Sequence, residues 1–131
     1  DLTVCKDTSY VTLTGDAINA NSGLWFSSGS GSFSLTNASL TTNYYPSGAD
    51  TAQNSIQLWM ETTGNGICNG TADTITINFD PIPEISAGSD ITTCADVNTI
   101  ILNGIISVAT QGVWSTNGTG TFNNINAFRV T

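Results

Sequence analysis

Hydrophobic and polar residues alternate with a period of two along most of the chain, which is the pattern of β-strands with one buried face. In residues 73–79, for example, Ile75, Ile77 and Phe79 fall on one face while threonine and asparagine fall on the other. No segment shows the 3.6-residue period of a helix. The pattern therefore predicts seven short strands, at residues 2–5, 10–14, 23–27, 33, 40–45, 55–62 and 73–79.

The sequence also repeats itself at an offset of 89 residues, and 15 of the 42 comparable positions are identical. The shared residues are mostly ones that fix backbone geometry or fill a core, so the repeat preserves a fold rather than a reactive centre. They include the pairs Cys5/Cys94, Gly15/Gly104, Gly23/Gly112, Trp25/Trp114, Gly29/Gly118, Gly31/Gly120 and Phe33/Phe122.

The repeat divides the chain into a first unit at residues 1–80, a joint at 81–89 and the N-terminal part of a second unit at 90–131. Pro81 and Pro83 are expected to hold the joint extended and stiff. A period of 89 suits a small β-sandwich and exceeds the period of solenoid repeats. We therefore predict an all-β protein, a seven-stranded immunoglobulin-like β-sandwich repeated in tandem, with the second copy incomplete.

The three cysteines are interpreted through the same repeat. Cys5 and Cys68 fall in the first unit, and a disulfide between them would close a long loop worth roughly 4 kcal/mol in chain-entropy models. Cys94 is the counterpart of Cys5, so its partner is expected beyond Thr131. One disulfide in each repeat indicates an oxidising, extracellular compartment.

The charge balance excludes several partners. The chain has two basic and ten acidic residues and a net charge of −8, which disfavours binding to nucleic acid or to an anionic membrane surface. No apolar run is long enough to span a bilayer, so membrane insertion is not expected.

Catalytic chemistry is also disfavoured. The chain has no histidine, so the commonest general base and the Ser–His and Cys–His nucleophile pairs are missing, and we do not expect an enzyme. Gly29-Ser30-Gly31 resembles a phosphate-binding loop in composition only, because neither a helix nor a lysine follows it. We interpret it as a hairpin turn. No cofactor is expected.

Calcium is the one metal that the acidic residues suggest. Asp80 and Glu84 in the joint, with Asp90 and Asp96 at the start of the second copy, are expected near the place where two repeats meet. Calcium prefers carboxylate and carbonyl oxygens. Against a calcium site, these residues lack the dense spacing of a dedicated calcium loop, and the alternative is that they keep a lysine-poor surface soluble.

Three aromatic residues interrupt the alternation and are expected to face outward. Trp59 lies between inward positions of its strand, and Phe26 stands beside Trp25 where the second copy has Ser115. If the third and sixth strands are neighbours, Phe26 and Trp59 form one exposed patch, with Tyr45 as a further outward aromatic. Such a patch suits a sugar ring or another domain, unless a loop covers it.

Several ordered motifs resemble the gliding-motility adhesin repeats of SprB-like surface proteins in Bacteroidetes. They are Ala87-Gly88-Ser89-Asp90-Ile91-Thr92-Thr93-Cys94, Gly23-Leu24-Trp25, Gly29-Ser30-Gly31-Ser32-Phe33, Asn43-Tyr44-Tyr45-Pro46-Ser47, Thr62-Thr63-Gly64-Asn65-Gly66-Ile67-Cys68 and Asp73-Thr74-Ile75-Thr76-Ile77. The resemblance covers nearly the whole chain. It implies a cell-surface fibre secreted through the type IX system, whose repeats usually carry serine or threonine where this chain has Phe26, Tyr45 and Trp59.

The resemblance also implies O-glycosylation, since Asp50-Thr51-Ala52 and Asp73-Thr74-Ile75 fit the short sequon used in that phylum. Thr51 and Thr74 are the acceptor residues that it suggests. The function expected overall is that of a structural repeat in an extracellular filamentous adhesin for surface attachment or gliding motility, with other repeats of the same fibre as partners. The alternatives are a carbohydrate-binding module that uses the aromatic patch to bind a polysaccharide, and a spacer domain of a secreted enzyme.

Overall fold

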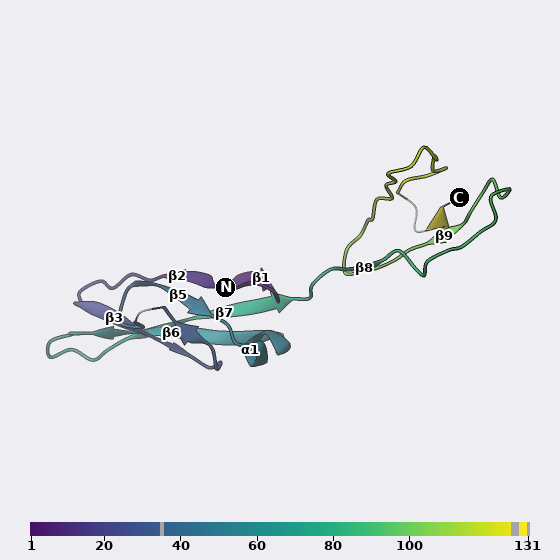
Figure 1. Cartoon of the computed structure of the whole chain (residues 1–131). Helices are drawn as coiled ribbons and strands as arrows, with labels where there is room; N and C mark the ends of the chain where they lie inside the picture. The colour runs from purple at the N-terminus through teal and green to yellow at the C-terminus, as the bar shows by residue number, and fades with distance from the viewer. Residues whose placement is uncertain (35, 127–128, 131) are drawn as a thin grey trace. The chain divides into compact units, whose positions relative to one another are not determined.

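The computed structural model describes residues 1–34, 36–126 and 129–130. Side-chain environments are described only up to residue 126. It is mostly β with several sheets, which confirms the predicted all-β class. The chain divides into two compact units, Asp1–Pro81 and Ile82–Thr131, which are considered separately (Figure 1). In the part of the chain that is described, no helix is long and apolar enough to cross a membrane.

All seven predicted strands of the first unit are present, each within one residue of the predicted ends. They are β1 (Leu2–Cys5), β2 (Val11–Thr14), β3 (Ser22–Ser27), β4 (Ser32–Phe33), β5 (Thr41–Tyr45), β6 (Ser55–Thr63) and β7 (Ala72–Asp80). Strict alternation of buried and exposed residues in β2 shows why the period-two pattern was sufficient to locate them.

The seven strands form two sheets that share one core. The first sheet has the order β1-β7-β6-β3 and the second has the order β2-β5-β4. Inward residues of both sheets meet in a single buried cluster, and the isoleucines and phenylalanine of β7 fall on its inner face as predicted. Its members are Val11, Leu13, Trp25, Tyr44, Ile56, Leu58, Met60, Ile77 and Phe79.

The first and last strands of this unit lie side by side and run in the same direction. β1 pairs in parallel with the second half of β7, from Leu2 opposite Ile77 to Cys5 opposite Asp80. The Lys6 amide extends the pairing by donating to the Asp80 carbonyl at 2.9 Å. Every other strand pair in the unit is antiparallel. The strand that enters the unit is thus joined directly to the strand that leaves it.

One short helix, α1 (Gly48–Ala52), was not predicted. It begins with a capping box in which the Ser47 hydroxyl accepts from the Asp50 amide and the Asp50 carboxylate accepts from the Ser47 amide. Five residues are too few to show a helical period, so the hydrophobic pattern could not reveal it.

The described residues of the second unit form four short strands in two pairs. β8 (Glu84–Ser86) pairs with β10 (Ile105–Ser107), and β9 (Leu102–Asn103) pairs with β11 (Arg129–Val130). β8 lies within the segment that the sequence marked as a joint. In the 89-residue register, β9 corresponds to the end of β2 and β11 to the start of β5, which also pair in the first unit.

The predicted disulfide between Cys5 and Cys68 is absent, and all three cysteines are free thiols. The reason is strand geometry. Cys5 lies opposite Asp80, at the C-terminal end of β7, whereas Cys68 lies in the turn before Ala72, at the N-terminal end. Nine residues of strand span roughly 26 Å, far beyond the roughly 7 Å limit between bridged Cα atoms. The prediction of a disulfide between Cys5 and Cys68 is therefore wrong, and a partner for Cys94 beyond Thr131 stays a prediction.

Candidate functional site

The glycine-rich loop at residues 29–31 is not the hairpin turn that its sequence suggested. It connects β3 to β4, but β3 pairs with β6 in one sheet and β4 pairs with β5 in the other. The loop therefore carries the chain across from one sheet to the other. Its amides point toward the N-terminus of α1, where the carboxylate of Asp50 lies completely buried.

Five donors hold the Asp50 carboxylate in an arrangement that we call the carboxylate cradle, and the most distant is the Ser30 hydroxyl, 3.4 Å from Oδ1. The Ser30 amide donates to Oδ1 at 2.7 Å and the Gly31 amide donates to Oδ2 at 2.9 Å. The Tyr44 hydroxyl and the Ser47 amide donate to the same Oδ2 at 2.8 and 3.0 Å. Backbone amides and hydroxyls thus replace water around a fully buried negative charge.

The cradle shifts the pKa values of both of its side chains. Burial alone acts to raise the pKa of Asp50, but the hydrogen bonds from Ser47, Ser30 and Tyr44 outweigh it, so this pKa lies below its ordinary value. Burial is also the main reason that the pKa of Tyr44 is raised, and the neighbouring carboxylate adds to the effect. Asp50 is therefore ionised and Tyr44 is neutral near pH 7.

The two glycines of the cradle leave room for this arrangement. A Cβ on Gly29 would lie 2.5 Å from Asp50 Oδ1, and a Cβ on Gly31 would lie 2.6 Å from the Tyr44 hydroxyl. Because the chain's own carboxylate fills the cradle, it offers no open position for a substrate or a phosphate group. Its role is structural, because its hydrogen bonds hold α1 and the loop at residues 29–31 against each other.

One signal in the sequence could have revealed part of this site. Ser47 and Asp50 are three residues apart, which is the spacing of a capping box with an aspartate at the third helical position. Asp50 and Tyr44, the two side chains that bind the loop, were not predicted to have any such role.

The predicted aromatic pair is present on the outer face of the first sheet. Phe26 of β3 and Trp59 of β6 are directly opposite in register, and their rings stack with centroids 5.5 Å apart at 15°. Both side chains are half-buried. The indole Nε1 of Trp59 donates to Glu61 at 3.1 Å, and Thr74 of β7 lies opposite Trp59 on its other side. The row Phe26–Trp59–Thr74 thus crosses three neighbouring strands.

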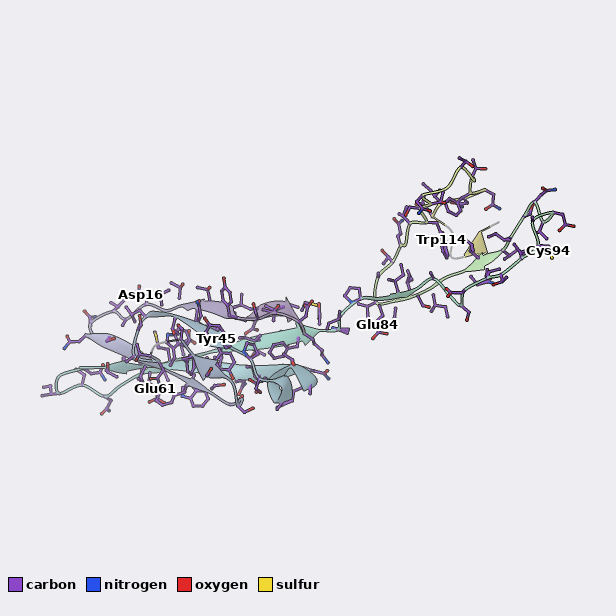
Figure 2. The ribbon with its side chains drawn as sticks, viewed as in Figure 1. Asp16, Tyr45, Glu61, Glu84, Cys94 and Trp114 are labelled. Atoms are coloured by element: carbon purple, nitrogen blue, oxygen red, sulfur yellow. The ribbon has the colours of Figure 1, made fainter. Side chains whose placement is uncertain are left out.

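Tyr45 does not belong to this aromatic row. It lies on β5 in the second sheet, is 41% exposed and packs against Tyr10 with ring centroids 5.9 Å apart. Figure 2 labels Tyr45 and Glu61, which mark the two different sheets. The three outward aromatics are therefore two separate surfaces, one on each sheet.

The acidic residues considered for calcium do not gather in the structure. Among the residues described, no group of three or more Asp, Glu, Cys or His side chains could hold a metal ion. Asp80 ends β7 in the first unit, while Glu84, Asp90 and Asp96 are exposed in the second. Figure 2 shows Glu84 and Cys94, close in sequence to Asp96, at opposite ends of that unit. The structure gives the calcium prediction no support.

The two candidate glycosylation sites differ in accessibility. Asp73 and Thr74 are both exposed on β7. Thr51 is half-buried in α1, with its hydroxyl 3.4 Å from the Gly48 carbonyl, and the Asp50 side chain that precedes it is enclosed in the cradle. Of the two sequons, only the one at Thr74 presents both of its polar side chains at the surface of the folded unit.

The chain matches no known protein-family signature, no curated protein and no solved structure.

Proposed function

We propose that this chain is a structural repeat of an extracellular filamentous adhesin that serves in surface attachment or gliding motility. Each repeat in this proposal is an immunoglobulin-like β-sandwich that transmits tension along the fibre. The observation that carries the proposal is the parallel pairing of β1 with β7 in the first unit.

Parallel pairing of the entering and leaving strands resists stretching for a geometrical reason. Tension on a fibre pulls β1 toward its N-terminus and β7 toward its C-terminus, so the two strands must slide past each other. All hydrogen bonds between Leu2–Cys5 and their partners on β7 are then loaded together, rather than broken one at a time as in an unzipping hairpin. The Asp1 carboxylate also accepts from the Thr76 amide at 3.0 Å.

The repeat supports this role because it keeps the residues that close the sandwich. Leu13, Gly23, Trp25 and Gly31 are core or close-packed positions in the first unit, and each is identical in the second copy. Outside the core, Phe26 becomes Ser115. A fibre needs a common fold along its length and tolerates variation on its outer faces. The likeness to gliding-motility adhesin repeats supplies the setting, a type IX-secreted fibre on a cell surface.

The extracellular location in this proposal no longer depends on a disulfide. It rests on that likeness and on a surface in which charged residues are only 9% of the sequence. Threonine, serine and asparagine cover the strands instead, and lysine and arginine, at which trypsin cleaves, are almost absent.

Single-molecule stretching of the full chain between its two ends tests the force-resisting role. Successive amides of a strand point to opposite sides, so either the Thr3 amide or the Val4 amide faces β7. The double variant Thr3→Pro/Val4→Pro removes both amides and therefore removes that one. We expect the first unit to unfold at a clearly lower force in this variant. The matched control is Met60→Ala, a core change about 2–5 kcal/mol destabilising that leaves the β1–β7 pairing intact. Equal unfolding forces in wild type and double variant would contradict the proposal, and so would an equal loss in the control.

The aromatic row favours a second candidate function, a carbohydrate-binding surface. Flat aromatic rings bind the apolar face of a sugar, and Glu61, Gln57 and Thr74 on the same outer face provide polar groups for hydroxyls. The net charge of −8 favours a neutral polysaccharide over an acidic one.

Binding of the full chain to insoluble cellulose, chitin and xylan, with alginate as the acidic comparison, tests this second candidate. The double variant Phe26→Ser/Trp59→Ser is expected to abolish retention on a neutral polysaccharide, while Tyr45→Ser on the other sheet is expected to retain it. If wild type and the double variant are retained equally, the row does not bind sugar, and the structural role stands without it.

A further inference from the structure

Two tyrosines lie side by side on the outer face of the second sheet. Tyr10 immediately precedes β2 and Tyr45 ends β5, and the strand register places them opposite each other, one position beyond the pair Val11 and Tyr44. Their ring centroids are 5.9 Å apart and the rings are inclined at 45°. At this separation two aromatic rings are in contact. Tyr45 is labelled in Figure 2.

Both of these rings are open to solvent. Tyr10 is 49% exposed and Tyr45 is 41% exposed. The residue opposite Tyr45 on its other side is Ser32 of β4, whose side chain is too small to cover a phenol ring. Exposed side chains change rotamer within nanoseconds. The edge of one ring can therefore come against the edge of the other without any movement of the backbone.

The third tyrosine of the chain has neither property. Tyr44 is fully buried, because successive side chains of β5 point to opposite faces and this one enters the core. Its hydroxyl donates to Asp50, and its ring packs edge-on against Phe33 with centroids 5.2 Å apart. Since the chain has three tyrosines, Tyr10 and Tyr45 are its single pair of accessible phenols.

The fold does not require a tyrosine pair at this place. The second copy has Thr99 at the position of Tyr10. The next pair on the same outer face of the first unit is Thr12 with Asn43, whose side chains hydrogen-bond at 2.9 Å. Small polar pairs of this kind are sufficient for the outer face, so the two tyrosines are a specific feature of the first unit.

We infer that Tyr10 and Tyr45 are an oxidative cross-linking site, at which the two side chains are joined into a dityrosine. The co-reactant is a one-electron oxidant driven by hydrogen peroxide, the class to which haem peroxidases belong. Each hydroxyl loses one hydrogen atom, as an electron and a proton, and the two phenoxyl radicals couple through ring carbons next to the oxygens. The hydrogens of those two carbons then return to the oxygens, so both hydroxyls are restored. In total one carbon–carbon bond forms, the chain loses two hydrogen atoms, and one hydrogen peroxide is reduced to two waters.

The cross-link has a mechanical consequence for the first unit. It ties the start of β2 to the end of β5, two positions that are 35 residues apart in the chain. When the unit is stretched from its ends, tension passes from Tyr10 directly to Tyr45, and the segment between them is not extended. An extended residue spans about 3.3–3.6 Å, so roughly 12 nm of the length otherwise released by unfolding stays closed.

This inference goes beyond the proposed function and does not depend on it, because the two phenols belong to the folded first unit whatever the chain does. Oxidation of the full chain with a haem peroxidase and hydrogen peroxide tests it, after the three thiols have been alkylated. In dilute protein we expect dityrosine fluorescence in the monomer and a mass lower by two hydrogen atoms. Cleavage before aspartate separates Tyr10, in residues 7–15, from Tyr45, in residues 16–49. We expect these two fragments to remain joined.

Three variants locate the new bond. Tyr10→Phe and Tyr45→Phe are each expected to abolish the joined fragments, because phenylalanine has no hydroxyl hydrogen to lose. Tyr44→Phe is the matched control and is expected to form them as wild type does. Joined fragments that persist in Tyr45→Phe, or a wild type that forms covalent dimers and no cross-linked monomer, would overturn the proposal.

Two further measurements test whether the folded geometry directs the reaction. Unfolding in urea before oxidation is expected to lower the yield of cross-linked monomer several-fold, because the strands no longer hold the two rings together. Single-molecule stretching of the cross-linked chain is expected to release roughly 12 nm less length from the first unit than stretching of the untreated chain. An equal yield in urea, or an unchanged release of length, would overturn the proposal.

Discussion

The two units share a framework of glycine and tryptophan positions but differ in what those residues contact. Trp25 is 4% exposed and belongs to a core that two sheets close. Its counterpart Trp114 is half-buried and lines a hollow of about 300 Å³ together with Ile85, Ile106 and Gly112. The 42 positions that the two copies share thus have different packing partners in the two units.

This difference explains why the repeat keeps glycines where it does. In the first unit, Met60 of β6 fills the space beside Gly23, where a Cβ would stand 2.6 Å from its Sδ. At Gly112 the nearest atoms to such a Cβ are 3.5 Å away, on Ile106 and Ile85. In the first unit, Gly23, Gly29 and Gly31 therefore serve contacts made by β6, α1 and β5, which come later in the chain.

The largest effect is expected from Asp50→Ala, which removes the centre of the carboxylate cradle. The amides of Ser30, Gly31 and Ser47 and the Tyr44 hydroxyl then lose their common acceptor. Since each buried donor left unpaired costs about 1–3 kcal/mol, we expect the free energy of unfolding of the first unit to fall by about 3 kcal/mol or more. Hydrogen exchange of the β6 amides reports this unit selectively.

The matched control is Asp73→Ala, which removes an exposed carboxylate from β7. Its effect is expected within about 0.5 kcal/mol. Equal losses in the two variants would mean that the cradle contributes nothing beyond a surface charge.

The strands and the cradle show where prediction from sequence succeeds and where it stops. Period-two alternation located all seven strands of the first unit, because each has one face in the core. The cradle was missed because it joins residues 29–31 to residue 50, and a hydrophobic pattern carries no information about polar contacts over that distance. The disulfide failed for a related reason. The number of cysteines says nothing about strand direction. Cys5 lies beside the C-terminal end of β7, whereas Cys68 lies before its N-terminal end.

A smaller and more selective effect is expected from alanine at the cradle glycine, compared with the same change in the other unit. A Cβ on Gly31 would overlap the Tyr44 hydroxyl and the Tyr45 carbonyl, whereas a Cβ on Gly120 has nothing within 4 Å. We expect Gly31→Ala to cost about 1–3 kcal/mol through overpacking and Gly120→Ala to cost close to nothing. Denaturant midpoints of the two variants check this, and a cost for Gly120→Ala equal to that of Gly31→Ala would remove the contrast between the units.

The smallest of the three effects is a pH dependence that belongs to the first unit, because protonation of Asp50 removes the charge but leaves the side chain in place. The pKa of Asp50 is lowered in the folded unit, so at acid pH the unfolded chain binds a proton before the folded chain does. The contribution of this carboxylate is fully present above its unfolded pKa, near 3.8, and is lost as pH falls through the lower folded value. We expect the denaturant midpoint of the first unit to decrease when the pH is lowered below about 4.

Tyr44 gives the opposite sign at alkaline pH, which makes the two halves of the cradle separable. Its pKa is raised in the folded unit, so its contribution is fully present below pH 10 and is lost as pH rises through the folded value. In Asp50→Asn the acid loss is expected to shrink, because the titrating group is gone. In Tyr44→Phe the acid loss is expected to become smaller but to persist, because the hydrogen bonds from Ser47 and Ser30 still lower the pKa of Asp50, and the alkaline loss is expected to disappear. If Asp50→Asn keeps the full acid loss of wild type, other carboxylates control the acid stability of this unit, and the cradle is a packing feature alone.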